Sequence, residues 1–468
     1  MNETIKRLNN SIPQAFELLY LSCLFFITFE IAVPLPVSIF KGLYIALFLA
    51  LLLRVALLRE GFKLLLPPFM RTGMILLPFF LLLGYLAWDV AGLFYSPDAG
   101  YAARKYYVVV PMLAFIIPTI SFAQDEDHLD RLYRTLGWSG AAVGLFSLSN
   151  YFIYEFVPLP YIRRLSMITD YNRYAENLFI AMVLMGFYII NTTPKRTHRT
   201  AKLTFALIFF ATLITLSGSR RTYLLMFPSI AALLLYRSFY IVRYSATERI
   251  AFYRLCKGLV LSVIAAAAVM GLQAGFEWYS DIKYEIKVEQ GGEVTEETSV
   301  DTVIDSISSG GMFGKRAVIW RTAVNDALEF DFLDILIGRG SGYDSYLYDH
   351  TSDPNLAAIY ANIEPKPKNW MNPHNFVLAD FLNGGLIRIL LSFTLAASVG
   401  ATLWAVFIRR ASRAVGLFLA MAFVYFSAFI SGRYGFVYDK FYYILLACLV
   451  AEHALALRAR PNAPKIGR

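Results

Sequence analysis

Apolar runs about as long as a lipid bilayer is thick recur from one end of this sequence to the other. A helix needs about 20 predominantly apolar residues to span a bilayer, and about twelve stretches approach that length. With 57% hydrophobic and 16% aromatic residues among 468, the chain carries more apolar side chains than a soluble protein of this size buries. The sequence therefore predicts an all-α polytopic membrane protein.

The predicted spans are grouped around one long polar interval. Nine spans occupy residues 1–276, a large loop domain occupies 277–384, and three spans with a polar tail occupy 385–468. The spans are Ala15 to Val33, Ser38 to Leu58, Gly73 to Phe94, Tyr106 to Ala123, Trp138 to Pro158, Ala175 to Asn191, Lys202 to Ser217, Tyr223 to Tyr240, Leu255 to Phe276, Gly385 to Ile408, Arg413 to Ile430 and Phe436 to Leu457.

Basic residues lie in short clusters between alternate spans, which gives the orientation. The formal net charge is +9, but the clusters follow the positive-inside rule and do not indicate a nucleic-acid partner. Both termini are therefore predicted to be cytoplasmic, and the large loop lies on the opposite face, which is the periplasm in a bacterium. The clusters are Arg54, Arg59, Lys63 and Arg71; Lys195, Arg196 and Arg199; Arg237, Arg243, Arg249 and Arg254; Arg409, Arg410 and Arg413; and Arg458, Arg460, Lys465 and Arg468.

The large loop contains several different segments. Asp281 to Gly311 is acidic and is predicted to be irregular. Met312 to Phe330 has the apolar spacing of an amphipathic helix, through Val318, Ile319, Ala323 and Leu328, and it places Arg316 and Trp320 on one face. The glycine run Gly338 to Gly342 lacks the parallel-sheet context of a nucleotide-binding loop, so that interpretation is rejected.

Ionisable residues gather at the predicted outer ends of the spans. Charged groups in spans are costly and usually face a protein interior or a wet cavity, so both signs at one depth predict a polar chamber that opens outward. The alternative is that each residue forms a structural pair. The residues are Arg163, Arg164, Arg173, Arg220, Arg221 and Arg433, with Glu30, Asp89, Glu155, Glu176, Asp380 and Asp439.

Four short motifs, in this order and topology, carry a likeness to a known family. They are RRLS at 163–166 leading into YNRYA at 171–175, LSGSRR at 216–221, RAVIW at 316–320, and PHN at 373–375 followed by Gly384, Gly385 and Leu386. With them the chain resembles the O-antigen ligase (WaaL) family, within the O-antigen ligase and polymerase (WaaL/Wzy) superfamily. The likeness covers most of the chain and is strongest from Arg163 to Arg388.

The resemblance implies a fold and an activity. It implies a GT-C-like glycosyltransferase of the bacterial inner membrane, without a cofactor, whose active site faces the periplasm. The donor would be an undecaprenyl-diphosphate-linked O-antigen, and the acceptor of a ligase would be a sugar hydroxyl of lipid A-core. In the related polymerase the acceptor is a second lipid-linked repeat, and this alternative stays open. A transporter of polysaccharide intermediates is the alternative from another class.

Arginine suits the leaving group of such a transfer. Breaking a sugar–phosphate bond leaves a pyrophosphate on which negative charge grows, and arginine forks bind phosphate oxygens in bidentate geometry. The predicted diphosphate-binding residues are Arg220, Arg221, Arg316, Arg163, Arg164 and Arg433. Arg220 and Arg221 also precede a helix start, whose free amides favour anions.

His374 is the predicted catalytic residue. Three of the five histidines, His128, His198 and His453, are predicted to face the cytoplasm. Of the other two, only His374 sits at a helix start against the membrane. A neutral imidazole can accept the proton of the acceptor hydroxyl. The alternatives are that His374 orients the acceptor or binds phosphate, and that Glu176 or Asp380 is the base.

The first predicted outer loop carries no acidic residue for a metal ion. It consists of the four residues Pro34 to Val37, whereas many lipid-dependent glycosyltransferases hold a divalent ion with acids there. The arginines would replace the metal as the charge partner. We therefore expect no metal site, and direct attack by the acceptor would invert the anomeric centre.

Overall fold

The computed structural model describes residues 2–57, 75–192, 196–242, 248–289, 314–351, 372–431 and 436–458. Every regular element within these ranges is a helix. Seven helical segments of the described chain are long and apolar enough to cross a membrane. The sequence prediction of an all-α membrane protein is confirmed at this level.

The seven segments coincide with seven of the predicted spans. The other five stay predictions: two match the shorter apolar helices Ala201–Leu216 and Ala414–Ile430, and three overlap the helices Glu126–Phe152, Arg220–Val242 and Glu248–Glu289. The seven segments are Pro13–Ala32, Ile39–Ala56, Leu77–Tyr95, Ala99–Phe122, Tyr171–Asn191, Phe376–Arg409 and Lys440–Arg458.

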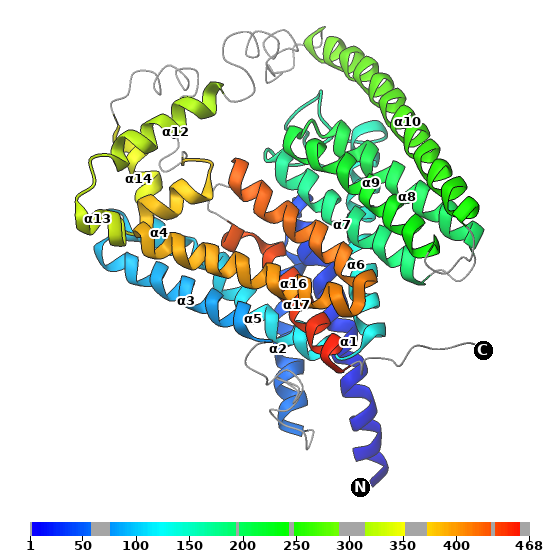
Figure 1. Ribbon diagram of the computed structural model, residues 1–468, viewed down its shortest axis with the longest axis horizontal. Helices are drawn as coiled ribbons and strands as arrows, with labels where there is room; N and C mark the ends of the chain where they lie inside the picture. The colour runs from blue at the N-terminus through cyan, green and yellow to red at the C-terminus, as the bar shows by residue number, and fades with distance from the viewer. Residues whose placement is uncertain are drawn as a thin grey trace. The chain divides into compact units, whose positions relative to one another are not determined.

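The chain divides into two compact units. Unit 1 comprises Met1–Pro67, Pro118–Glu297 and Val406–Ala420. Its helices are α1 (Asn2–Ala32), α2 (Ile39–Leu57), α6 (Glu126–Phe152), α7 (Tyr171–Thr192), α8 (Arg196–Leu216), α9 (Arg220–Val242) and α10 (Glu248–Glu289). Within this unit α7 is central, because it packs against α1, α6, α8 and α9 and is 89% buried over its apolar window (Figure 1).

Small residues let the helices of unit 1 approach closely. A Cβ atom built on Gly140 of α6 would lie 2.2 Å from the Cβ atom of Ala181 on α7. One built on Gly144 would lie 2.2 Å from a methyl group of Leu213 on α8. Membrane helices often approach each other closely at small residues. Lipid tails are as apolar as the side chains, so the helices associate mainly through van der Waals packing.

The long helix α10 corrects one prediction. An irregular segment is expected from Asp281, but the helix continues to Glu289. Contacts with the end of α6 and the connection after it explain the extension, since Lys283 Nζ donates to the carbonyl of Tyr151 at 2.8 Å and Arg163 lies over the Tyr284 ring. The remainder of the predicted irregular segment lies outside the described residues.

Unit 2 comprises Pro68–Ile117, Thr298–Ala405 and Met421–Arg468. Its elements are α3 (Leu77–Ala91), η3 (Gly92–Tyr95), α4 (Ala99–Arg104), most of α5 (Tyr106–Phe122), α12 (Gly314–Ala327), α13 (Phe332–Ile337), α14 (Tyr343–His350), most of α16 (Phe376–Ser431), η4 (Phe436–Tyr438) and α17 (Lys440–Arg458). The helix α12 confirms the amphipathic helix predicted for the loop.

The element α16 folds back on itself (Figure 1). A straight helix from Phe376 to Phe429 would be about 80 Å long at 1.5 Å per residue. The rings of these two residues instead lie 6.3 Å apart, so the chain reverses between them. This reversal agrees with the two predicted spans on either side of residues 409–412.

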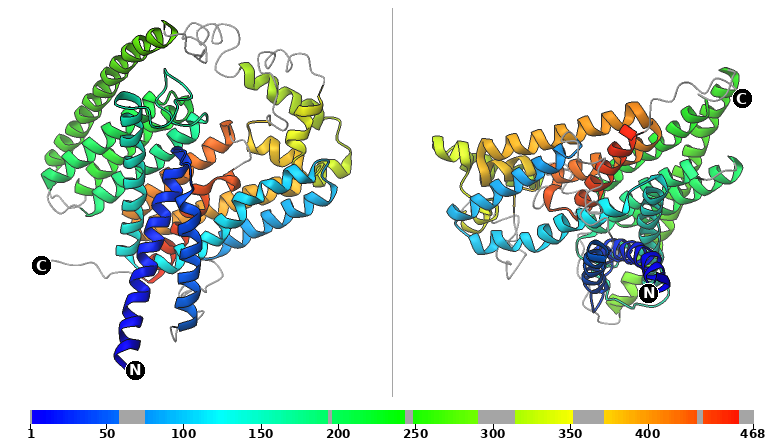
Figure 2. Two further views of the ribbon diagram at one scale, coloured as in Figure 1. Left: turned by 180° about the vertical axis from the view of Figure 1, so that it is seen from behind. Right: turned by 90° about the horizontal axis from the view of Figure 1, so that it is seen from below.

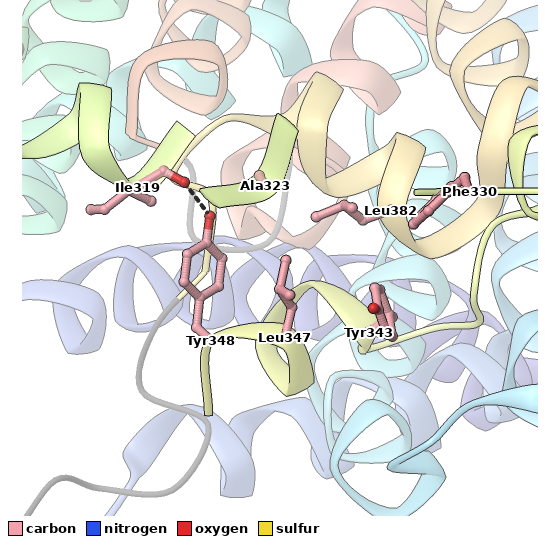
Figure 3. Packing of buried hydrophobic residues seen from close by; sticks show 7 residues of the cluster. All are labelled: Ile319, Ala323, Phe330, Tyr343, Leu347, Tyr348 and Leu382. Carbon is pink, nitrogen blue, oxygen red and sulfur yellow. Dashed lines mark hydrogen bonds between the residues drawn. The ribbon is translucent and has the colours of Figure 1, made fainter. Parts of the chain in front are cut away.

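The loop helices of unit 2 pack on the start of α16 through a small hydrophobic cluster (Figure 3). Ile319 and Ala323 of α12 are 2% and 0% exposed, as the helical pattern predicts. Tyr348 of α14 donates its hydroxyl to the carbonyl of Ile319 at 2.7 Å. The prediction is wrong for Leu328, which the pattern assigns to the same apolar face. Leu328 lies just past the end of α12 and is 79% exposed.

The glycine run after α13 allows the loop to pack closely against α16. Gly338 and Gly340 have φ values of +72° and +94°, and a Cβ atom on Gly338 would lie 2.4 Å from the backbone nitrogen of Gly384. The amides of Arg339 and Gly340 donate to the carbonyls of Leu382 and Asn383 at 2.9 and 3.1 Å. Because these amides are used within the protein, the rejection of a nucleotide-binding loop is supported.

Candidate functional site

Most of the predicted diphosphate-binding arginines lie together in unit 1. Two of them, Arg163 and Arg164, belong to the connection between α6 and α7, and two begin α9 after the Ser217–Gly218 turn. The amide of Leu165 donates to the carbonyl of Leu216 at 2.9 Å, which joins the connection to the end of α8. Gly218 has a φ of +72°, and its missing side chain leaves room for Arg164, whose Nε would lie 3.1 Å from a Cβ atom there. We call Arg163, Arg164, Arg220 and Arg221 the arginine cluster.

Aromatic rings support two members of the arginine cluster. The guanidinium carbon of Arg164 lies 4.1 Å from the ring centroid of Tyr171 and 5.5 Å from that of Tyr161. That of Arg163 lies 4.5 Å from the Tyr284 centroid, and its Nε is 3.2 Å from Asp281. Stacking on an aromatic face fixes the orientation of a guanidinium group.

The other two members differ in burial. Arg221 is nearly buried and lies 3.6 Å from Glu176, with side chains 9% and 5% exposed. Arg220 is the first residue of α9 and is exposed, and none of the described residues forms an ion pair with it. The turn before it is fixed, because Ser219 Oγ donates to Asn172 Oδ1 at 2.9 Å. Helix amides and fixed guanidinium groups make this end of unit 1 suited to an anion.

Lys283 adds a further positive charge beside the cluster. Burial lowers the pKa of Lys283 below its usual value, and the nearby carboxylate of Glu155 partly opposes that shift. Its ammonium lies 4.3 Å from the Tyr151 ring centroid. Lys283 is a neighbour of the cluster that the sequence did not single out, because it lies beyond the predicted end of its span.

His374 occupies a distinctive backbone position in unit 2. It has a φ of +49° and is the only non-glycine residue with a positive φ in the described part of the chain. Its amide donates to Asn372 Oδ1 at 2.9 Å, and Asn375 caps the start of α16 by accepting from Val377 N at 2.9 Å. The two buried asparagines therefore hold the backbone of His374 in place, and the residue is partly exposed.

Arg316 lies on α12, one helical turn before a residue that contacts the histidine turn. Trp320, one helical turn after Arg316 on α12, donates its indole N–H to the carbonyl of Pro373 at 2.9 Å. Residues four apart share a helix face, so Arg316 and Trp320 lie on the same face of α12. His350 is placed differently: it ends α14 and stacks on Tyr346 at 3.9 Å between ring centroids.

A buried ionic network in unit 2 joins Asp89 and Asp380, two of the predicted rim acids, to Arg388, which the sequence analysis did not single out. Arg388 of α16 is 2% exposed, contacts Asp89 of α3, and donates Nε to Asp380 at 3.0 Å. Tyr85 donates to Asp380 at 2.7 Å, and Tyr438 donates to Asp89. We call Arg388 with Asp89 and Asp380 the buried triad.

The buried triad also forms a hydrogen bond with the loop segment after α13. Ser341, from the glycine run after α13, donates to a carboxylate oxygen of Asp89 at 2.7 Å. Asp380 lies one turn into α16, close in sequence to His374. The triad thus connects α3, the loop and the first turns of α16 within unit 2.

Three other acids predicted at the outer rim are helix or turn caps. Glu30 accepts from the amide of Phe40 at 2.7 Å, Asp439 from that of Phe441 at 2.8 Å, and Glu155 from that of Leu159 at 2.9 Å. Of the predicted acids, Glu176 alone contacts the arginine cluster. The structural alternative is therefore correct for these three residues.

Arg433, the last predicted diphosphate-binding residue, lies outside the described residues. Among the residues that are described, no three His, Cys, Asp or Glu side chains group closely enough to hold a metal ion. No protein-family model matches the chain. The curated proteins likewise contain no significant match.

Proposed function

We propose that this protein is a glycosyltransferase of the O-antigen ligase type. It takes a glycan from undecaprenyl diphosphate and joins it to a sugar hydroxyl of lipid A-core. The proposal places twelve spans and a GT-C-like fold in the bacterial inner membrane, with both termini cytoplasmic and the active site facing the periplasm.

In the proposed step, the acceptor oxygen attacks the anomeric carbon of the donor glycan. The new carbon–oxygen bond forms as the bond from the anomeric carbon to the phosphate oxygen breaks, and the electron pair leaves with the diphosphate. The acceptor proton passes to the His374 imidazole. Attack opposite the leaving group inverts the anomeric centre, and guanidinium groups stabilise the charge that develops on the diphosphate.

The arginine cluster is the observation that carries this proposal. Two of its guanidinium groups begin α9, and two lie over tyrosine rings in the connection between α6 and α7. Clustered arginines suit phosphate oxygens, which supports the proposal. The His374 turn supports it further, since a partly exposed residue with a left-handed backbone is typical of functional positions.

The first experiment is transfer by purified protein from a lipid-linked glycan donor. Glycan found on lipid A-core supports the ligase. Lengthened lipid-linked glycan means the polymerase instead, and movement of unmodified donor across a vesicle membrane means a transporter. A reaction that continues in EDTA supports a metal-free step, whereas a reaction restored only by magnesium or manganese rejects it.

The variant His374→Asn tests whether His374 is the general base. Asparagine tolerates the left-handed backbone at this position but has no imidazole, so the fold should be kept. Loss of a general base lowers kcat by about 100- to 10,000-fold. The matched control is His350→Asn, which changes a histidine of the same loop that stacks on Tyr346. Equal activity of both variants and the wild type would contradict the assignment.

A further inference from the structure

An apolar groove of about 650 Å³ lies in unit 1 between α6, α8 and α10. On α10 it is formed around Gly271 and Gly275, where an added Cβ atom meets nothing within 4 Å. On α8 it extends from Phe205 to Leu216, about 16 Å along the helix axis. This volume is within the range of about 300–1,000 Å³ that small-molecule sites occupy. We call it the α8–α10 groove.

The lining of the α8–α10 groove is hydrocarbon and aromatic. None of the described residues that line it carries a charge. α8 and α10 pack together along the unit, and Figure 2 shows the long green helix α10 running beside α8. A ligand that fits here must therefore present a long apolar body.

One end of the groove is cationic. Phe152 and Tyr279 line that end, with ring centroids 5.1 Å apart, and Lys283 follows Tyr279 by one helical turn on the same face. The Lys283 ammonium donates to the carbonyl of Tyr151, which is adjacent to Phe152 in sequence. The positive charge of Lys283 is therefore fixed at one end of the α8–α10 groove.

The arginine cluster lies at the same end. Leu216, the last groove residue of α8, accepts a hydrogen bond from the amide of Leu165, directly after Arg163 and Arg164. Arg163 also contacts Asp281 and Tyr284 of α10, just beyond Tyr279. Asp281 is paired with Arg163 and Glu155 lies near Lys283, so the basic residues outnumber the acids at this end. An apolar groove with such an end matches an amphiphile with an anionic head.

We propose that the α8–α10 groove binds the hydrocarbon chain of a single-chain lipid diphosphate, with the diphosphate at the end formed by Arg163, Arg164 and Lys283. A polyprenyl diphosphate carries one hydrocarbon chain and two phosphates, which matches one apolar groove with several basic residues at its end. A phospholipid with two acyl chains and one phosphate matches fewer of these cations. This inference rests on the proposed function, because the lipid is the donor named there.

Gly275→Leu tests the groove by filling it. The glycine faces open space, so leucine meets no protein atom at its Cβ, and it also favours the helix over glycine. We expect KM for the long-chain donor to rise by about tenfold or more, which corresponds to about 1.4 kcal/mol. A donor analogue with a geranyl chain, too short to fill the groove, should keep its wild-type KM.

Gly42→Leu is the matched control. It makes the same change on α2, at a glycine that also faces open space but does not line the groove. It should leave KM unchanged for both donors. An unchanged KM for the long-chain donor in Gly275→Leu, with the wild type active, would overturn the groove while leaving the proposed function intact.

Photocross-linking tests the groove without an activity measurement. A long-chain polyprenyl diphosphate with a diazirine in its chain should label peptides from 205–216 and 271–279 in the full-length protein. Unlabelled polyprenyl diphosphate should suppress the labelling, and phosphatidylglycerol in equal excess should not. Equal suppression by phosphatidylglycerol would overturn the proposal in favour of an ordinary phospholipid site. If the wild type transfers no glycan from any donor, the proposed function fails. The labelling result still shows whether the α8–α10 groove binds the lipid chain.

Discussion

Arg388 in unit 2 and Arg220 in unit 1 are held in opposite ways. In unit 2, Arg388 is 2% exposed and is surrounded by two carboxylates and two tyrosine hydroxyls. In unit 1, Arg220 is exposed at the start of α9, and Arg164 lies over a tyrosine ring. The first arrangement uses the guanidinium to hold the protein together, whereas the second leaves the Arg220 side chain exposed to solvent.

Burial explains the difference. A charge removed from water must recover its solvation through fixed partners, so a buried arginine is stable only when carboxylates surround it. An exposed arginine keeps its solvation and can exchange water for a ligand. The comparison teaches that the number of arginines near a rim is a weak guide to a ligand-binding site. The burial of each guanidinium group and the number of its carboxylate partners are better guides.

The largest effect is expected for Arg388→Met. It removes the cation and leaves Asp89 and Asp380 as buried charges without compensation, which costs about 3–5 kcal/mol of unfolding free energy. The measurement is thermal unfolding of the purified protein in detergent. The triple variant Arg388→Met with Asp89→Asn and Asp380→Asn should recover part of the loss. A single variant as stable as the wild type would show that the triad does not hold unit 2.

Gly385→Ala should have the next largest effect. Gly385 has a φ of +61°, and an added Cβ atom would lie 2.5 Å from backbone atoms of Leu336. Strain of this kind costs about 1–3 kcal/mol. Gly400→Ala on the same element is the control, since nothing lies within 4 Å of that glycine. Equal melting temperatures for the two variants would contradict the close packing of the loop on α16.

Trp320→Phe should have a smaller effect on stability. It keeps an aromatic ring but removes the indole N–H that donates to the carbonyl of Pro373. The loss of one such hydrogen bond costs about 1 kcal/mol. Because the bond anchors the turn that contains His374, transfer activity should fall more than the melting temperature suggests. An unchanged rate would separate this contact from the site.

Asp125→Ala should have the smallest effect, and this effect should depend on pH. Asp125 caps α6 by accepting from the amide of His128 at 2.9 Å, and losing such a cap costs about 1 kcal/mol. Burial alone would raise the pKa of Asp125, but hydrogen bonds from the amides of His128 and Asp127 and the His128 imidazole hold it below its usual value.

The sign of the pH effect follows from that lowered pKa. The stabilisation by Asp125 is complete above the unfolded pKa of about 3.9 and is lost as the pH falls through the lower folded value. The gap in melting temperature between wild type and Asp125→Ala should therefore be constant near neutral pH and close only below about pH 4. A gap that widens in acid would contradict the cap.

Local patterns in the sequence predicted the helices well. Apolar runs gave seven segments that the structure describes as long enough to span, and the spacing of Ile319 and Ala323 gave the buried face of α12. The pattern failed at Leu328, where the helix ends, and at Asp281, where contacts with a distant connection extend α10. Both failures occur at element ends, where tertiary contacts outweigh periodicity.

The sites were predicted less completely. The arginine cluster could be found because Arg163–Arg164 and Arg220–Arg221 interrupt apolar sequence in adjacent motifs. The buried triad could not, because Asp89 lies 299 positions from Arg388 and no local spacing joins them. A charged residue inside a predicted span was the one available signal for Arg388, and it needed a partner from another helix to be interpreted.

The most direct test of the central claim compares two arginines of unit 1. Arg220→Ala and Arg173→Ala each remove an exposed guanidinium, but Arg173 is outside the cluster and lies beside Asp170 at 3.5 Å. The measurement is equilibrium binding of polyprenyl diphosphate to each purified variant in the same detergent. Losing a hydrogen bond to a charged group should weaken binding to Arg220→Ala by about 10- to 100-fold, while Arg173→Ala binds as the wild type does. Equal affinity of both variants and the wild type would contradict the claim that the arginine cluster holds the lipid diphosphate.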